Sequence, residues 1–372
     1  MDKLLLEDCC EILDSMRVPI TSSDRVEGPY PYYGANGIQD HVSDYIFDDE
    51  LVLLAEDGGN FGSKEKPIAY RVSGKCWVNN HAHVLKPKEG IDVDYLCYSL
   101  MFYNVGGMVN GATRQKLTQA AMRQMLIPKR TMEEQKHIVE LLAKVVAVRE
   151  KRQQELDELD NLIKARFVEM FGDIKTNNMN WDKVQMKNVV DIRGRVGWKG
   201  YKKEDLRENG PLVLGATHLT DSGDLDLSAP VFLSREKYEE SPEIVLQRND
   251  LIFTQRGNTI GKVGLVEHDI GEATINPCVL ILRPQNVNPI YLKSYFVMDE
   301  TKDDMWLLNS GSAQPMITQK GIGDYYMMLP PKELQDSFAD FVKQVDKSKV
   351  VVQRSLDESQ KLFDSLMQEY FG

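Results

Sequence analysis

Two long amphipathic segments dominate the pattern of apolar and polar positions in this 372-residue chain. The first has apolar residues at steps of mostly three and four, the spacing of a helix that packs along one seam. These are Ile138, Leu141, Val145, Val148, Leu156, Leu159, Ile163, Phe167 and Met170. Thr131 and Glu134 form a T-x-x-E capping box, and Gly172 is typical of a helix C-cap. The pattern predicts one helix of roughly 38 residues, about 57 Å long, with Arg152 interrupting its seam.

The second segment repeats the first at an offset of 200 residues. Phe338 then corresponds to Ile138, and the final Phe371-Gly372 corresponds to Phe171-Gly172. A second helix is predicted over about 332–370, after a Pro-Pro pair that suits a first helical turn.

The repeat extends beyond the helices. "GATRQKLTQ" (111–119) matches "GSAQPMITQ" (311–319), and "DKLLLEDCCEI" (2–12) matches "DKVQMKNVVDI" (182–192). The offset widens between Leu219 and Gln255, which indicates an insertion in the second copy. A repeat of this length predicts a duplicated domain and not a solenoid.

Short apolar runs punctuated by Gly and Pro, such as "ELVLLAED" and "DLIFTQRG", predict strands in both copies. The expected fold class is therefore α+β, with two similar mixed α/β domains separated by long helices. The predicted segments are a domain at 1–130, a helix at 131–172, a domain at 173–330 and a helix at 331–372. Two helices of matched length are expected to form an antiparallel coiled coil, which would place the domains at opposite ends with approximate two-fold symmetry.

The net charge, the lack of a long apolar stretch and the cysteine content limit the functions that the chain is expected to have. The net charge of −12 argues against a chain that holds nucleic acid alone over a wide surface, but it allows a local basic patch or a basic partner. Neither a membrane-spanning apolar stretch nor a signal-peptide pattern is present. The five cysteines lack a CxxC motif and are expected to be reduced thiols of a cytoplasmic protein.

The whole pattern resembles the specificity (S) subunits of type I restriction–modification enzymes. The stretches that carry the resemblance are "YPYYGANGIQDHVSDYIFDDELVLLAEDGGNFG" (30–62), the helix at 133–173, "FTQRGNTIGKVGLV" (253–266) and "LPPKELQDSFADFVKQVD" (329–346).

This resemblance implies that each domain is a target-recognition domain that reads one half of a bipartite DNA sequence in the major groove. The coiled coil would set the spacing between the half-sites. The implied partners are double-stranded DNA, two modification (methyltransferase) subunits and restriction translocase subunits, without a membrane. The chain itself would be non-catalytic and hold no cofactor or metal. S-adenosylmethionine, Mg and ATP are expected only on the partner subunits.

Polar and aromatic residues in the loops are candidates for reading base edges. In the first domain they are Tyr32, Tyr33, Asn36, Asn60, Lys64, Asn80, His81, Arg114 and Gln115. In the second they are Arg195, Lys199, Tyr201, Lys202, Thr217, His218, Gln255, Arg256, Asn258, Thr259, Lys262, Ser312 and Gln314. Simpler readings stay open: the tyrosines as packing residues, Asn36-Gly37 as a hairpin turn, and the basic run 193–203 as solvated surface.

Enzymatic readings fit less well. "GNTIGKV" is one residue short of a phosphate-binding loop, and Val263 stands where Ser or Thr is required. "NPCV" (276–279) lacks the second proline and the aromatic residue of an amino-methyltransferase motif. His81 and His83 lack a third zinc ligand nearby in sequence, and no convincing nuclease carboxylate pattern occurs. The remaining alternative to DNA recognition is a coiled-coil scaffold that binds protein partners.

Overall fold

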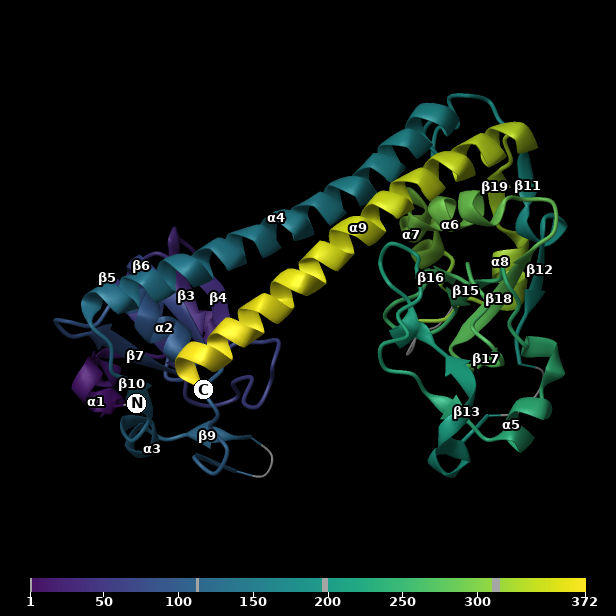
Figure 1. The fold of residues 1–372 in the computed structure, drawn as a ribbon. Coiled ribbons are helices and arrows are strands. Elements are labelled where there is room, and N and C mark those ends of the chain that lie inside the picture. Colours follow the sequence, from purple (N-terminus) through teal and green to yellow (C-terminus); the bar gives the residue numbers. More distant parts are fainter. Residues whose placement is uncertain (1, 112–113, 196–199, 310–314) are drawn as a thin grey trace. The chain divides into compact units, whose positions relative to one another are not determined.

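The computed structural model describes residues 2–111, 114–195, 200–309 and 315–372. The chain folds into two compact units (Figure 1). Unit 1 comprises Met1–Arg152 and Ser355–Gly372, and unit 2 comprises Gln153–Arg354. Each unit therefore contains part of both long helices, α4 (Met132–Phe171) and α9 (Lys332–Phe371), whereas the sequence predicts helices separate from the globular domains.

The ends of α4 lie where the sequence predicts them. The Thr131 backbone N–H donates to Glu134 Oε2 at 2.8 Å, and the Glu134 N–H donates to Thr131 Oγ1 at 3.3 Å, which is the predicted capping box. Gly172 ends the helix with a φ of 78°, in the left-handed region that glycine adopts without strain. α9 has the same length as α4, 40 residues.

Unit 1 is built on a six-stranded sheet with strand order β2-β7-β5-β6-β3-β4. Its strands are β2 (Cys10–Ile12), β3 (Tyr30–Gly34), β4 (Gly37–Val42), β5 (Phe47–Ala55), β6 (Ala69–Val78) and β7 (Ala82–Pro87). The pairs are antiparallel except β3 with β6. Helix α2 (Val93–Met101) packs against β5 and β6 (Figure 1).

Unit 2 repeats this arrangement with one break. A four-stranded sheet has the order β12-β18-β15-β16, and a three-stranded sheet has the order β14-β13-β17. The strands are β12 (Val190–Arg193), β13 (Leu206–Leu214), β14 (Phe232–Leu233), β15 (Leu251–Thr254), β16 (Val263–Leu265), β17 (Ala273–Ile275) and β18 (Val279–Pro284). β16 and β17 occupy the place of the ten-residue β6, so the single sheet of unit 1 becomes two sheets here.

The remaining elements are short. Two-residue and three-residue strands pair as β1 (Lys3–Leu5) with β10 (Leu126–Pro128), β8 (Val109–Asn110) with β9 (Lys116–Leu117), and β11 (Lys183–Gln185) with β19 (Tyr326–Met328). The other helices are α1 (Leu6–Cys9), α3 (Gln119–Arg123), α5 (Arg235–Glu239), α6 (Pro289–Val297), α7 (Asp299–Leu307) and α8 (Gln319–Asp324). α5 lies within the predicted insertion.

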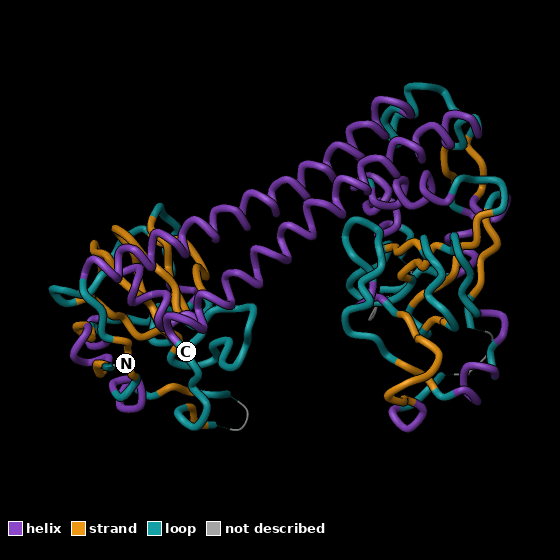
Figure 2. The backbone as a smooth tube through the Cα atoms, viewed as in Figure 1, coloured by secondary structure: helices purple, strands orange, loops and turns teal. Residues whose placement is uncertain are grey.

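Within each unit the segments of α4 and α9 lie side by side (Figure 2), and the colours along the chain in Figure 1 show that they run antiparallel. In unit 2 the ring of Phe167 meets that of Phe338, with centroids 5.6 Å apart, and Lys349 forms an ion pair with Asp160. In unit 1 the Arg149 guanidinium lies 5.2 Å from the ring centroid of Phe363. The predicted antiparallel pairing is therefore observed in both units.

One detail of the predicted helix seam is wrong. The sequence pattern places Leu141 and Val148 on the buried seam, but Leu142 is the fully buried leucine, and Val148 is 45% exposed. The seam has to face a globular domain as well as the other helix, so its register departs from a simple heptad. Among the residues described, no helix is apolar over a length that could cross a bilayer.

Candidate nucleic-acid interface

Three loops of unit 1 are joined by backbone hydrogen bonds at one end of the sheet. The Glu56 N–H donates to the His81 carbonyl at 2.8 Å, and the Leu117 N–H donates to the Glu56 carbonyl at 2.7 Å. The Gly58 N–H donates to the Gln115 carbonyl at 3.1 Å. We call this bonded set of segments, 56–58, 79–81 and 114–117, the loop frame of unit 1.

Unit 2 has the same frame. The Gln255 N–H donates to the Cys278 carbonyl at 3.0 Å, and the Ile317 N–H donates to the Gln255 carbonyl at 2.8 Å. The Gly257 N–H donates to the Pro315 carbonyl at 3.0 Å. The loop frame of unit 2, segments 255–257, 276–278 and 315–317, thus reproduces that of unit 1 bond for bond.

A side-chain bond supports both frames in the same way. The Asn79 side-chain oxygen accepts from the His81 N–H at 2.8 Å, and that of Asn276 accepts from the Cys278 N–H at 2.8 Å. Because these bonds use backbone groups and buried or half-buried amides, the exposed side chains of the frame can differ without disturbing it.

Two polar side chains on the unit 1 frame, those of His81 and Arg114, contact Asp57. The Asp57 Oδ1 atom lies 2.6 Å from His81 Nδ1 and 2.8 Å from Arg114 Nη2. Asn36, from the turn between β3 and β4, donates to the Gly58 carbonyl at 3.0 Å. Three predicted residues, Asn36, His81 and Arg114, are therefore brought together here from separate segments.

Unit 2 carries different side chains on its frame. Arg256 takes the place of Asp57, since each forms the isolated bridge to the third segment, Arg256 with Met316 and Asp57 with Lys116. Gln255 donates from its amide to the Pro277 carbonyl at 3.1 Å, and Arg256 Nη2 lies 3.4 Å from Met316 Sδ. The two frames match in backbone and differ in charge.

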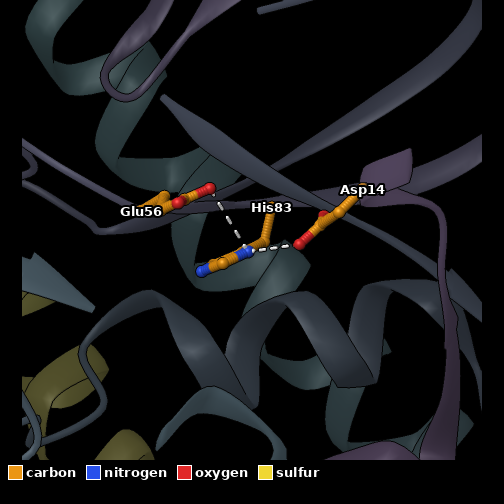
Figure 3. A group of neighbouring side chains, drawn as sticks. All are labelled: Asp14, Glu56 and His83. Atoms are coloured by element: carbon orange, nitrogen blue, oxygen red, sulfur yellow. Dashed lines mark hydrogen bonds and ion pairs between the residues drawn. The ribbon is translucent and has the colours of Figure 1, made fainter. Parts of the chain in front are cut away.

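Beneath the unit 1 frame lies a buried ionic cluster (Figure 3). His83 Nδ1 is 2.7 Å from Asp14 Oδ2 and 3.7 Å from Glu56 Oε2. His83 Nε2 is 2.9 Å from the Leu117 carbonyl oxygen. Both ring nitrogens face acceptors, so both bonds form together only when the ring carries two protons.

Cations surround the same cluster. Arg17 Nη1 lies 2.6 Å from Glu56 Oε2, and Lys116 Nζ lies 2.8 Å from Glu56 Oε1. Burial raises the pKa of Glu56, but these two hydrogen bonds, together with the charges of His83 and Arg17, hold the pKa below its usual value. Asp14, Glu56 and His83 have donor atoms close enough for a metal site. Their charges are already matched by Arg17 and Lys116, so the cluster fits a structural ion network and not a metal centre.

Unit 2 does not repeat the pair formed by Asp14 and His83. A Cβ on Gly194 would meet Leu280 and Gln319, at 2.6 and 2.4 Å, just as Asp14 meets His83 and Gln119 in unit 1. The sequence repeat and these contacts make Gly194 the counterpart of Asp14, and Leu280 the counterpart of His83.

The predicted residues other than Tyr32 and His218 differ in how exposed their side chains are. Asn36, Lys64, Asn80, Arg114, Gln115, Lys202, Thr217, Asn258 and Thr259 are exposed, and Tyr33, Asn60, His81, Arg195, Tyr201, Gln255, Arg256 and Lys262 are half-buried. Lys199, Ser312 and Gln314 lie outside the described residues. Asn60, Lys64 and Lys262 have no hydrogen bond to a frame among those described: Asn60 bonds the Pro67 carbonyl, and Lys262 pairs with Asp221.

Two residues that the sequence predicts as DNA contacts are buried in the structure. Tyr32 is 1% exposed, and its hydroxyl oxygen accepts from the Ile20 N–H at 3.1 Å. His218 is 7% exposed, and its Nδ1 accepts from the Gly215 N–H at 3.1 Å. Both side chains hold loops in place and do not reach a ligand surface.

Sequence reasoning missed Asp57, Glu56 and Asp14. A search for DNA-reading side chains passes over carboxylates, because carboxylates repel phosphates. The usable signal was the pairing of "ED" at 56–57 with "QR" at 255–256 in the repeat, which marks a place where charge differs between equivalent loops.

The family of the chain follows from comparison with known proteins. Residues 2–161 and 178–357 each match the type I restriction modification DNA specificity domain. The chain therefore belongs to this family and contains two copies of its domain.

Among curated relatives, the chain is 39% identical over 143 residues to a putative type I restriction enzyme specificity subunit of Haemophilus influenzae. That alignment covers 38% of this chain and 37% of the relative. It is 24% identical over 115 residues to the EcoprrI specificity subunit of Escherichia coli, over 31% of this chain and 27% of the relative. The matched stretches thus span about a third of each curated relative.

Solved structures support the fold over the full length. The S subunit of a type I restriction–modification system from M. genitalium matches with a TM-score of 0.56 at 14% identity, covering 100% of this chain and 96% of that one. A chain from a structure of complex assembly and conformational transition in the type I system matches with a TM-score of 0.52 at 17% identity, with the same coverage.

Proposed function

We propose that this chain is the DNA-recognition subunit of a type I restriction–modification enzyme. Each unit reads one half of a bipartite target in the major groove, and the chain itself catalyses no reaction. The observation that carries the proposal is the pair of matched loop frames with different exposed side chains. A fixed backbone with variable polar tips is suited to reading two different base sequences with one fold.

The two long helices have the roles of spacer and dock in this proposal. They fix the distance between half-sites and bind two modification subunits, which hold S-adenosylmethionine, while restriction translocase subunits bring ATP and Mg to the larger complex in the cytoplasm. The supporting observations are two helices of 40 residues that pair antiparallel in both units.

Methylation mapping tests the proposal. The chain is expressed with a modification subunit of its own system in a host without other methylation, and the methylated sequence is read from the genome. We expect a two-part motif. Replacing Arg256 and Asn258 by Ala should relax one part of this motif and leave the other part unchanged.

The control is Arg235→Ala, which removes an arginine of unit 2 that lies outside the loop frame and pairs with Glu272 at 2.5 Å. It should leave both parts of the motif intact. Methylation that does not depend on this chain, or a motif unaltered by the Arg256 and Asn258 changes, would contradict the proposed role of unit 2. A scaffold that binds only proteins would give that result.

A further inference from the structure

Arg114 is an exposed predicted DNA contact of unit 1 that is held by a less exposed carboxylate. Its side chain is 59% exposed, whereas the Asp57 carboxylate that binds it is only 20% exposed. The Asp57 Oδ1 atom accepts from Arg114 Nη2 at 2.8 Å and lies 2.6 Å from His81 Nδ1, which is itself 3.4 Å from Arg114 Nη2. Asp57 is thus placed to orient Arg114 outward.

Gly58 leaves the room for this arrangement. A Cβ at Gly58 would lie 3.2 Å from Arg114 Nε and 3.4 Å from Nη2, closer than most side-chain contacts. Gly58 also has a φ of 65°, which favours glycine. The guanidinium therefore lies over the glycine backbone, within the loop frame.

The ion pair between Asp57 and Arg114 is expected to add little to the stability of the fold. An exposed ion pair contributes about 0–1 kcal/mol to folding, because solvent screens it and two side chains lose freedom. Orientation has a clearer use, since an arginine that is already ordered loses less conformational freedom when it binds.

The chemistry of an ordered guanidinium selects one base. Arg can donate two parallel hydrogen bonds to O6 and N7 of guanine, a pattern that the other bases do not present in the major groove. The neighbouring carboxylate also offsets the charge of Arg114, which weakens attraction to phosphates and favours a role in base reading.

We propose that Arg114, positioned by Asp57, reads one guanine in the half-site of unit 1. This inference rests on the proposed function and adds the base and the pair of residues. Arg114 contacts the base, and Asp57 is a positioning residue. The counterpart position in unit 2 holds Arg256 in place of the carboxylate, so this pair belongs to unit 1.

Methylation mapping with matched variants gives the first test. Arg114→Ala and Arg114→Lys should both relax the motif at a single G·C position, because lysine keeps the charge but loses the planar fork. Asp57→Asn should weaken preference at the same position. Arg123→Ala breaks another ion pair of unit 1, with Glu7 at 3.2 Å, and should leave the motif unchanged.

A second test changes the DNA base instead of the protein. The complex with the modification subunit is titrated with DNA of the mapped sequence, with guanine or 7-deazaguanine, which lacks N7, at the implicated position. The wild-type complex should lose about tenfold or more in affinity on the analogue. The Arg114→Ala complex should bind both DNAs equally, with a salt dependence close to that of the wild type.

The outcomes separate the two proposals. A wild-type chain that directs no sequence-specific methylation overturns the proposed function. A wild-type two-part motif that stays unchanged in both Arg114 variants, or relaxes at an A·T position, overturns the guanine assignment alone. Equal effects of Arg123→Ala and Arg114→Ala, or full wild-type affinity for 7-deazaguanine at every guanine of that half-site, do the same.

Discussion

Gln135 and Gln335 make equivalent hydrogen bonds in the two units. The side-chain oxygen of Gln135 accepts from the Asp92 N–H at 2.8 Å, and that of Gln335 accepts from the Asn288 N–H at 2.8 Å. The Gln135 amide nitrogen donates to the Arg130 carbonyl at 3.1 Å, and that of Gln335 donates to the Pro330 carbonyl at 2.8 Å; Gln135 also donates to the Gly90 carbonyl at 2.9 Å. Each glutamine, 1% exposed, ties the first turn of a long helix to its globular domain.

Replacing either glutamine by leucine should therefore destabilise the unit that contains it. Gln135→Leu leaves the Asp92 N–H and backbone carbonyls without partners, with a loss of about 3 kcal/mol. Hydrogen exchange should show faster opening of α2 in the Gln135 variant and of α6 in the Gln335 variant. Gln154→Leu, whose exposed amide bonds only Glu158 among the described contacts, is the control and should change neither. Unchanged protection of α2 in Gln135→Leu would contradict this assignment.

The buried cluster of unit 1 predicts strong coupling between His83 and Asp14. His83→Leu alone leaves a buried carboxylate without its main partner and should destabilise unit 1 by about 3 kcal/mol or more. His83→Leu combined with Asp14→Gly copies the pairing of Leu280 with Gly194 in unit 2 and should recover part of this loss. Protection of β7 against hydrogen exchange measures the effect, with β18 as an internal reference. Strictly additive losses would argue against the coupling.

Acid should weaken unit 1 through Asp14. Burial raises the pKa of this carboxyl, but hydrogen bonds from His83, Val84 and Gln119 and the charge of His83 prevail, so the pKa is below its ordinary value of 3.8. A lowered folded pKa means that the stabilisation is complete above pH 3.8 and is lost as the pH falls through the folded value.

The test is the acid dependence of β7 protection. Wild-type protein should lose protection below about pH 4, and Asp14→Asn, which is less stable at neutral pH, should have a flatter profile in that range. Parallel profiles for the two proteins would show that another group controls the acid response.

If the helices act as the proposed spacer, their length should set the gap between half-sites. Seven residues inserted after Arg152, matched by seven after Arg354, lengthen both helices where the two compact units divide. The added length is about 10 Å, or about three base pairs. Methylation mapping should show the same two half-sites with a wider gap. An unaltered gap in an active variant would exclude the spacer role, and insertion in one helix alone should abolish activity by shifting the pairing.

The acidic composition predicts weak binding by the chain alone. With a net charge of −12, the chain should need the modification subunits for most phosphate contacts. Gel-shift titrations on the mapped sequence should show much tighter binding, with a steeper salt dependence, when those subunits are present. Equal affinity with and without them would contradict this division of roles.

The hydrophobic periodicity and the internal repeat predicted most of the fold. Helix ends depend on a few neighbouring residues, and a repeated sequence is expected to repeat its fold. The capping box at Thr131, the end at Gly172 and the 200-residue offset located both helices, and the widened offset located the insertion. The exposed Val148 was missed because a heptad pattern does not include the globular surface that the helix also covers. The approximate two-fold symmetry between the domains stays a prediction.

The candidate interface was harder to predict than the fold. Loop composition pointed to Asn36, His81 and Arg114, which the structure gathers, but it also pointed to Tyr32 and His218, which are buried. Aromatic and histidine side chains suit both roles, and only the three-dimensional contacts distinguish them. The carboxylate that pairs with His81 and Arg114, Asp57, left only an indirect signal in the sequence, the charge difference between "ED" at 56–57 and "QR" at 255–256.

The division of each long helix between the two units affects how the chain responds to cleavage. The segment 173–182 joins α4 to the rest of unit 2, while residues 355–372 contribute Phe363 and Leu366 to the core of unit 1. A protease that cuts the chain once within 173–182 leaves every long helix intact. The two fragments would remain noncovalently associated, and the nick would become visible only after denaturation.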